Sequence, residues 1–234
     1  MNITNENNME LMARYEDKHF DLAIVDPEYG IGASKPSKKP NKAKQKNGSI
    51  LNVRSVNYVH KNWDSKAADV SYFRELKRVS KNQIIWGVNY YDFILKGGRI
   101  VWDKINGESD QYGCEIAYCS LNNRTDIIRY LWSGMFQGLH ISKEIAKANI
   151  QQGNKSLNEI RFHPTQKPVK LYEWLLMNYA KEGDKILDTH LGSGSIAIAC
   201  HNLKYDLTAC ELDEDYYNAA MLRLKQHQKQ IRLF

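Results

Sequence analysis

The sequence is poor in the features that mark membrane, secreted and metal-binding proteins. No stretch approaches the roughly 20 consecutive apolar residues that cross a bilayer, and the N-terminus has neither the basic nor the apolar region of a secretory signal. Cysteine is scarce, with four in 234 residues, and no two cysteines have the CxxC spacing of many zinc sites. We therefore expect reduced thiols in a cytoplasmic protein that has no membrane segment and no metal site.

The length and composition are those of one folded domain. With 42% hydrophobic and 26% charged residues, the chain is not disordered throughout, and it fits neither a collagen nor a coiled coil. We expect a single domain over residues 1–234. Residues 31–62 and 121–162 lack apolar periodicity, and we interpret each as an insertion into this domain.

Acidic residues are absent from the segment between Tyr29 and Trp63. This segment carries eight lysines and arginines while the whole chain has a net charge of +6, so the remaining residues are close to neutral. Either a solvated lysine-rich loop or an arm that binds the phosphates of a polyanion would explain the pattern. The residues that the second hypothesis assigns to DNA are Lys35, Lys38, Lys39, Lys42, Lys44, Lys46 and Arg54.

Strands alternate with helices in the rest of the chain. Apolar patterns predict strands over 21–25, 83–86, 99–102, 115–118, 185–188 and 206–210. They predict helices over 67–79, from Pro168 at a first helical position, over 195–203 and over 214–230. This alternation predicts an α/β fold with a mainly parallel sheet that is covered on both faces.

A glycine-rich segment, Asp188–Ser195, stands between a predicted strand and a predicted helix. Its glycines allow the backbone to approach a ligand closely, and the helix N-terminus offers free N–H groups. Glu211 follows the next strand, where a carboxylate can bind ribose hydroxyls. A turn without a ligand and a dinucleotide fingerprint are the alternatives, although only 40 residues follow Gly194, too few for a dinucleotide domain.

Two further motifs carry polar groups to positions where chemistry is expected. Asp26-Pro27-Glu28-Tyr29 follows a strand, and residues at the carboxyl edge of such a sheet face a ligand crevice. His163–Pro168 has two prolines that make a rigid corner, and Thr165, Gln166 and Lys167 offer donors to an anion such as an amino-acid carboxylate. Taken alone, the first motif would be read as a strand-ending turn and the second equally as a helix-entry corner.

In this order, the three motifs resemble those of the β-class amino-methyltransferases of DNA, permuted S-adenosylmethionine enzymes of bacteria and phages. Further matches are QIIWGVNY at 83–90, Trp102-Asp103-Lys104 and the segment 114–120. The resemblance covers nearly the whole chain. It implies a Rossmann-like methyltransferase sheet, mostly parallel with an antiparallel edge, and a circularly permuted motif order.

The resemblance also implies residue roles. It makes Asp26, the Pro27 carbonyl and Tyr29 catalytic, and 121–162 a small target-recognition insertion. The residues that it implies for binding S-adenosylmethionine are Asn7, Asp26, Thr165, Gln166, Lys167, Asp188, His190, Leu191, Gly192, Ser193, Gly194, Ser195, Glu211 and Leu212.

The implied reaction is site-specific methylation of the exocyclic amine of a base in double-stranded DNA. Asp26 and the Pro27 carbonyl accept the two amine hydrogens, while Tyr29 stacks on a base that has left the duplex. In the family, an Asp that opens the tetrapeptide leans toward adenine N6 and a Ser toward cytosine N4, so we expect an adenine enzyme. A cytosine-N4 enzyme and a weakly active relic that binds DNA and cofactor are the alternatives.

Three positions depart from the family pattern: Glu28 replaces a proline, His190 a phenylalanine and Asn7 an acid. We expect Glu28 to lie near a DNA phosphate and to slow the enzyme, unless it hydrogen-bonds within its own loop.

Dimers occur in the family, and a cognate restriction endonuclease can accompany its members. The sequence leaves both partners open, together with the recognition site.

Overall fold

The computed structural model describes residues 1–34, 42–44, 48–52, 61–105, 113–133, 136–139 and 158–230. Its strands are β1 (Asn2–Asn5), β2 (Phe20–Val25), β3 (Lys42–Lys44), β4 (Ile50–Asn52), β5 (Ser80–Trp86), β6 (Gly98–Asp103), β7 (Cys114–Cys119), β8 (Thr125–Ser133), β9 (Phe136–Leu139), β10 (Lys185–Asp188) and β11 (Asp206–Glu211). Its helices are α1 (Asn8–Ala13), α2 (Val70–Val79), the 3-10 turn η1 (Val88–Tyr90), α3 (Val169–Tyr179), α4 (Ser195–Leu203) and α5 (Glu214–Lys229). None of these helices is long and apolar enough to cross a membrane.

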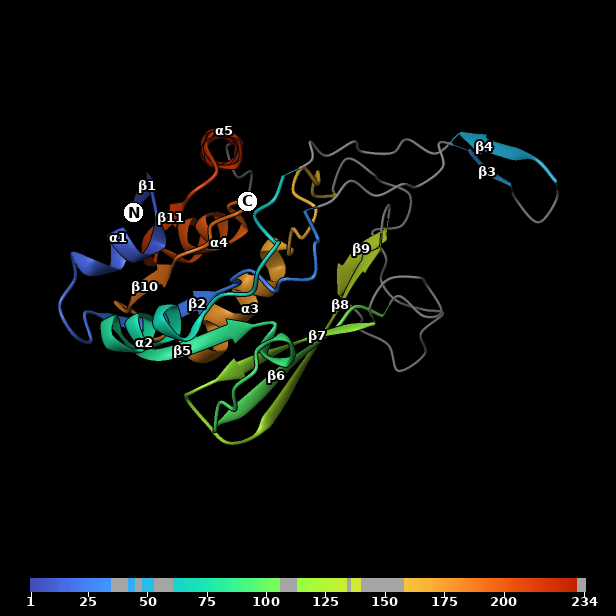
Figure 1. Cartoon of the computed structure of the whole chain (residues 1–234). Coiled ribbons are helices and arrows are strands. Elements are labelled where there is room, and N and C mark those ends of the chain that lie inside the picture. The colour runs from blue at the N-terminus through green and yellow to red at the C-terminus, as the bar shows by residue number, and fades with distance from the viewer. Residues whose placement is uncertain are drawn as a thin grey trace.

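One mixed sheet organises the domain, with the strand order β1-β11-β10-β2-β5-β7-β6-β8-β9 (Figure 1). The strands from β1 to β5 in this order run parallel, whereas β7 is antiparallel to both of its neighbours and β9 to β8. The structure therefore confirms a mostly parallel sheet with an antiparallel edge. The late strand β10 pairs with the early strand β2, so the glycine loop and the tetrapeptide leave neighbouring strands at one edge.

Side chains of the central strands alternate between the two faces of the sheet, as the period of two requires. Leu22 and Ile24 of β2 join the core beneath α3, α4 and α5. Ala23 and Val25 join the core beneath α1 and α2. Helices thus cover both faces, which explains why β2 reads as a continuous apolar run.

Capping residues determine where the helices begin. Asp69 accepts N–H bonds from Ser71 and Tyr72, so α2 begins at Val70 and not at residue 67. Pro168 is the N-cap of α3 and not its first helical residue. Asp213 caps α5 through the N–H groups of Asp215 and Tyr216.

Within 121–162, which we expected to be an insertion with a role in target recognition, Thr125–Ser133 and Phe136–Leu139 are strands of the main sheet, and the target-recognition role stays a prediction. Here β8 pairs in parallel with β6, and β9 completes the edge of the main sheet. Ile128, Tyr130 and Trp132 are buried while Ile127 and Arg129 are exposed, so the period of two was present but went unrecognised. Residues 140–157 lie outside the described part of the chain.

Within 31–62, which we expected to be a loop, β3 and β4 form an antiparallel hairpin. The register pairs Lys42 with Asn52 and Lys44 with Ile50. The other parts of this segment that the structure describes are residues 31–34, 48–49 and 61–62.

Candidate active site

Two cavities open at one edge of the sheet and share Thr165, Gln166 and Lys167. The first measures about 360 Å³ and lies among the loops that follow β1, β2, β10 and β11. The second measures about 570 Å³ and lies among the ends of β5, β6, β7 and β8. Both volumes fall within the range of small-molecule sites, roughly 300–1,000 Å³.

The glycine loop (Asp188–Ser195) forms one wall of the first cavity. Gly192 and Gly194 have φ values of +52° and +71°, in the left-handed region that favours glycine. The Gly192 N–H donates to Glu211 Oε2 at 2.8 Å, which ties the loop to the end of β11. The helix α4 begins directly after Gly194 without a side-chain cap, and its first residues are buried behind the cavity wall.

Most of the residues expected to bind a cofactor do line the first cavity. They are Asn7, Asp26, Thr165, Gln166, Lys167, His190, Leu191, Gly192, Ser193, Glu211 and Leu212. Asp188, Gly194 and Ser195 lie outside the lining. The Asp188 carboxylate accepts the His190 N–H at 3.0 Å, and Ser195 Oγ accepts from Arg223 at 2.9 Å, so both support the loop from behind.

Two of the lining residues are engaged differently from the expectation. The Gln166 amide accepts the Phe162 N–H at 3.2 Å and donates to the Ile160 carbonyl at 3.1 Å, and so holds its own corner together. Lys167 forms an ion pair with Asp26 and a second one with Glu115, whose Oε2 lies 3.0 Å from the Lys167 ammonium.

The cavity also contains residues that sequence reasoning did not select. His163 packs between the rings of Trp63 and Tyr216, and its Nδ1 accepts the Thr165 N–H at 3.3 Å. Burial, with repulsion from Lys167, lowers the pKa of His163 to about 3, so the imidazole is neutral. Its position inside the hexapeptide was the only sequence signal.

Hydrogen bonds and an ion pair hold the oxygens of Asp26 and Pro27 in the tetrapeptide (Asp26–Tyr29). Asp26 Oδ1 accepts from the Tyr29 hydroxyl and Oδ2 pairs with Lys167. The Pro27 carbonyl accepts from the hydroxyl of the buried Tyr91 at 3.3 Å. The oxygens that the expected mechanism needs are therefore oriented before any substrate arrives.

Buried charge surrounds the point where the cavities meet. Glu115, the first residue after Cys114 in β7, pairs with Lys167 and also with Lys104 at 2.6 Å. Burial alone would raise the pKa of the Glu115 carboxyl, but the two lysines hold it below its ordinary value. Burial would lower the pKa of Lys167, but Asp26 and Glu115 hold it above. Lys167 is thus an ammonium bridging two carboxylates.

Asp64 anchors the backbone that follows the tetrapeptide. Its carboxylate accepts the N–H groups of Tyr29 and Gly30, both at 2.8 Å, and of Ala33 at 2.7 Å. The Asp64 side chain is almost fully buried, since the residue is only 1% exposed. No local pattern predicts this contact, because Asp64 lies beyond the basic segment.

The Tyr29 ring lies on a glycine. It stacks on Tyr90 with a centroid separation of 4.8 Å and an interplanar angle of 17°. A Cβ at Gly87 would lie 2.0 Å from the Tyr29 ring, and the Gly87 φ of +70° disfavours other residues as well. Only glycine at position 87 permits this placement of Tyr29.

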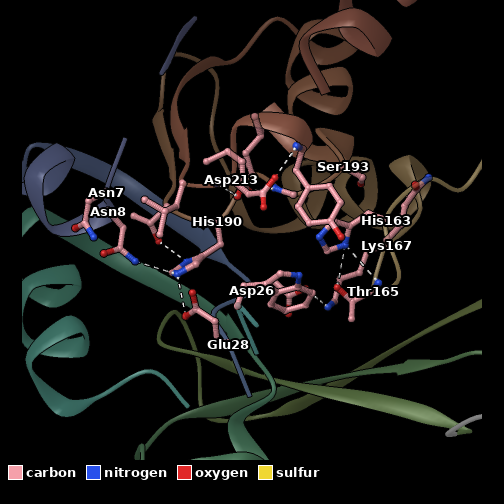
Figure 2. A pocket seen from close by; sticks show the side chains of 18 of the residues that line it. Asn7, Asn8, Asp26, Glu28, His163, Thr165, Lys167, His190, Ser193 and Asp213 are labelled. Atoms are coloured by element: carbon pink, nitrogen blue, oxygen red, sulfur yellow. Dashed lines mark hydrogen bonds and ion pairs between the residues drawn. The ribbon is translucent and has the colours of Figure 1, made fainter. Parts of the chain in front are cut away.

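Glu28 lines the first cavity, and its expected position near a DNA phosphate stays a prediction. Its Oε2 lies 3.3 Å from Nε2 of His190, so two of the three departures from the family pattern contact each other (Figure 2). Burial alone would raise the pKa of Glu28, but His190 holds it below its ordinary value. The reverse holds for His190, whose pKa is raised by Glu28 against the effect of burial.

The basic segment is described in part. The backbones of Lys42 and Lys44 lie in the β3–β4 hairpin, whereas Lys35, Lys38, Lys39, Lys46 and Arg54 lie outside the described residues. Lys61, at the end of the segment, pairs with Asp213 and with Asp215, the latter at 2.7 Å. That lysine is therefore used within the fold, and DNA binding by the others stays a prediction.

Comparison with known proteins agrees with this geometry. A family model described as DNA methylase, of the N6/N4 methyltransferases, matches residues 34–222. The chain belongs to this family. It is 24% identical to the type II methyltransferase M.HpaI of Haemophilus parainfluenzae over 93% of this chain and 72% of that one.

Two solved structures resemble this DNA methyltransferase in fold. The M1.HpyAVI–SAM complex aligns with a TM-score of 0.52 and 17% identity, over 95% of this chain and 98% of the other. The cytosine-N4-specific PvuII DNA methyltransferase aligns with a TM-score of 0.52 and 12% identity, over 99% of this chain and 87% of the other. The family match and these likenesses in fold do not distinguish N6-adenine from N4-cytosine methylation.

Proposed function

We propose that this DNA methyltransferase transfers a methyl group from S-adenosylmethionine to N6 of an adenine that has left the duplex. The observation that carries the proposal is the position of Asp26, which lines the first cavity and pairs with Lys167, a residue of both cavities. Asp26 directly precedes Pro27, whose carbonyl accepts from Tyr91. The first cavity would hold the cofactor and the second the base. Double-stranded DNA is then the substrate, and the cytoplasm of a bacterial cell the expected location.

The first cavity suits S-adenosylmethionine in charge and in shape. The cofactor supplies a methyl group on a positively charged sulfonium, and the acidic residues that line the cavity are Glu6, Asp26, Glu28, Glu211 and Asp213. Glu211 Oε1 and Oε2 each accept one backbone N–H, which leaves lone pairs for ribose hydroxyls.

The second cavity suits a flipped base. Aromatic rings of Tyr29, Tyr90 and Trp132 line it, and base stacking on an aromatic ring contributes about 1–3 kcal/mol. Asn89 and Lys104 add polar groups that can read the base edge. Extrusion costs a few kcal/mol, which stacking offsets.

Asp26 and Pro27 would act on the exocyclic amine. The Pro27 carbonyl has a second lone pair beside the one that Tyr91 uses, and it accepts one amine hydrogen. Asp26 accepts the other once Lys167 shifts toward Glu115, its second partner at 3.0 Å. The nitrogen lone pair then attacks the methyl carbon as the sulfur–carbon bond breaks, and the surplus proton on nitrogen passes to Asp26. Positioning supplies most of the rate.

Adenine is favoured over cytosine on two grounds. The tetrapeptide opens with Asp26, and a cavity of about 570 Å³ has room for a purine. The alternative is N4 methylation of cytosine, as the name of the PvuII structural neighbour states for that enzyme. A second alternative is a relic that binds DNA and cofactor without turnover.

Transfer of labelled methyl groups to DNA of mixed sequence tests the proposal. After hydrolysis to nucleosides we expect label in N6-methyldeoxyadenosine. Label in N4-methyldeoxycytidine would overturn the base assignment. Calorimetric cofactor binding with no label in any nucleoside would support the relic. Long-read sequencing of DNA from expressing cells then gives the recognition site, and a co-purification from the native host tests for a homodimer or a cognate restriction endonuclease.

A further inference from the structure

The Glu28–His190 contact joins two loops that the reaction needs together. Glu28 belongs to the tetrapeptide after β2, and His190 to the glycine loop after β10. Their side chains are 29% and 13% exposed, and Glu28 Oε2 lies 3.3 Å from His190 Nε2 (Figure 2). The same ring nitrogen lies 3.0 Å from the side-chain amide nitrogen, Nδ2, of Asn8 at the start of α1.

The surroundings of the ring favour its charged form. His190 Nδ1 lies 2.9 Å from the Thr189 hydroxyl oxygen, and that hydroxyl lies 2.7 Å from the hydroxyl of the buried Tyr72. An oxygen atom therefore faces each ring nitrogen, Thr189 Oγ1 at Nδ1 and Glu28 Oε2 at Nε2, and the Asn8 amide nitrogen also faces Nε2. An imidazolium donates from both nitrogens, whereas a neutral imidazole donates from one only. The ion pair with Glu28 uses the Nε2–H of an imidazolium, with the Asn8 amide turned so that its oxygen, and not Nδ2, faces the ring.

We propose that His190 is a positioning residue whose imidazolium holds Glu28, and through it the tetrapeptide, against the cofactor loop. The proposal deepens the function proposed above and rests on it. Glu28 is bonded through its backbone to Asp26-Pro27 on one side and to Tyr29 on the other. A side-chain tether at position 28 therefore restrains both acceptors of the amine relative to the cofactor.

The tether is expected to open at high pH. The charged and titratable groups that face His190 are Glu28, Asp188, Glu211 and Tyr72, and the three carboxylates all favour the imidazolium. A group with a raised pKa contributes fully below its ordinary pKa, and its contribution is lost as the pH rises through the raised value. Cofactor binding and methyl transfer should both weaken over that rise.

Nuclear magnetic resonance tests the charged state without any DNA. We expect the ring protons of His190, assigned by their loss in His190→Phe, to titrate above the ordinary histidine range in the native protein. In Glu28→Gln the midpoint should fall by about one pH unit or more. An unchanged midpoint in Glu28→Gln overturns the tether. The pair Glu16–His19, at 3.9 Å and with an exposed Glu16, gives the matched control Glu16→Gln, which should leave the His190 midpoint unchanged.

A double-mutant cycle tests the positioning role. His190→Phe leaves Glu28 in the cavity without its partner, and single-turnover methyl transfer should slow by about tenfold. Glu28→Pro alone should also slow the enzyme, the opposite of the expectation from the sequence. The double variant Glu28→Pro/His190→Phe should recover most of the methyl-transfer rate that each single variant loses. Its rate should show no change with pH around the His190 midpoint. Losses that simply multiply in the double variant would overturn the proposal.

The outcomes separate this proposal from the proposed function. If the native protein transfers no methyl group, the proposed function fails, while the His190 midpoint and calorimetric S-adenosylmethionine binding still report on the tether. If methyl transfer proceeds with an unshifted His190 midpoint, the tether fails and the function stands. Thermal unfolding of every variant identifies any that fails to fold, and Glu28→Gln then replaces Glu28→Pro in the cycle.

Discussion

The two cavities that share Lys167 are built from different kinds of backbone. The first lies at the ends of the parallel strands β1, β2, β10 and β11, and the three sequence motifs supply eleven of its twenty lining residues. The second lies at the ends of β5, β6, β7 and β8, and its rings come from segments far apart in the chain. A contiguous motif is enough to predict a site that is formed by a loop between a strand and a helix. A pocket lined by side chains of several strands can be predicted only when the register of those strands is known.

The largest expected effect is the loss of methyl transfer on replacement of Asp26, while cofactor binding in the first cavity is retained. Asp26→Ala should reduce methyl transfer by about a thousandfold or more, because it removes an acceptor of the target amine. Calorimetry should give cofactor affinity within a few-fold of the native value, and Asp92→Ala, at an exposed position, should change neither. Retained turnover would contradict the catalytic assignment.

Next in size is the loss of the basic segment that follows the tetrapeptide. Replacing Lys38, Lys39, Lys42, Lys44 and Lys46 by Gln should weaken DNA binding by about a hundredfold and flatten its salt dependence, because each phosphate contact adds about −0.9 to the log–log slope. Cofactor binding should not change. The control replaces five exposed lysines elsewhere, Lys77, Lys181, Lys185, Lys225 and Lys229. Equal slopes in both variants would mean that the segment is only solvated.

The second cavity can be disturbed alone through Gly87. A methyl group at this position would lie 2.0 Å from the Tyr29 ring, so Gly87→Ala should displace the ring and slow single-turnover methyl transfer by about thirtyfold. Cofactor affinity should stay within a few-fold. Gly183→Ala is the matched control, because Gly183 has a φ of +84° with nothing within 4 Å of its Cβ position. It should cost about 1 kcal/mol of stability and no rate.

A smaller effect is expected where the cavities meet. Glu115→Gln removes the second carboxylate with which Lys167 pairs. Lys167 should then remain paired with Asp26, and methyl transfer should slow by about tenfold. In a Lys167→Met background the same change should have little further effect. If Glu115→Gln costs as much rate there as in the native chain, Glu115 does not act through Lys167.

The smallest effect concerns Asp188, which supports the first cavity from behind. Burial raises the pKa of Asp188 to about 7, so this group stabilises the fold below its ordinary pKa of 3.8, and the contribution is lost as the pH rises through 7. The Tm of the cofactor-free protein should therefore fall by roughly 5 °C more between pH 5 and 8 than that of Asp188→Asn. Parallel Tm curves for the two proteins would contradict the raised pKa.

Local signals in the sequence determined much of the parallel half. The strand at 185–188 and the helix at 195–203 were predicted with the bounds that the structure has, because an apolar run, a glycine loop and a helix start follow one another there. Five of the positions that line the first cavity, residues 189–193, belong to the same loop. The period of two in β8 was equally local, and it was missed because the basic, mixed composition around it indicated an insertion.

Tertiary structure alone decided which polar groups meet. Asp64 accepts N–H groups of a loop that lies some thirty residues earlier in the chain. Lys167 pairs with Asp26 and Glu115, and the three residues come from segments far apart in the sequence. Glu28, after β2, contacts His190, after β10. Periodicity reports which side of an element is buried, and it carries no information on partners far along the chain. Those pairings depend on strand order and register, which bring β2, β7 and β10 to one edge of the sheet.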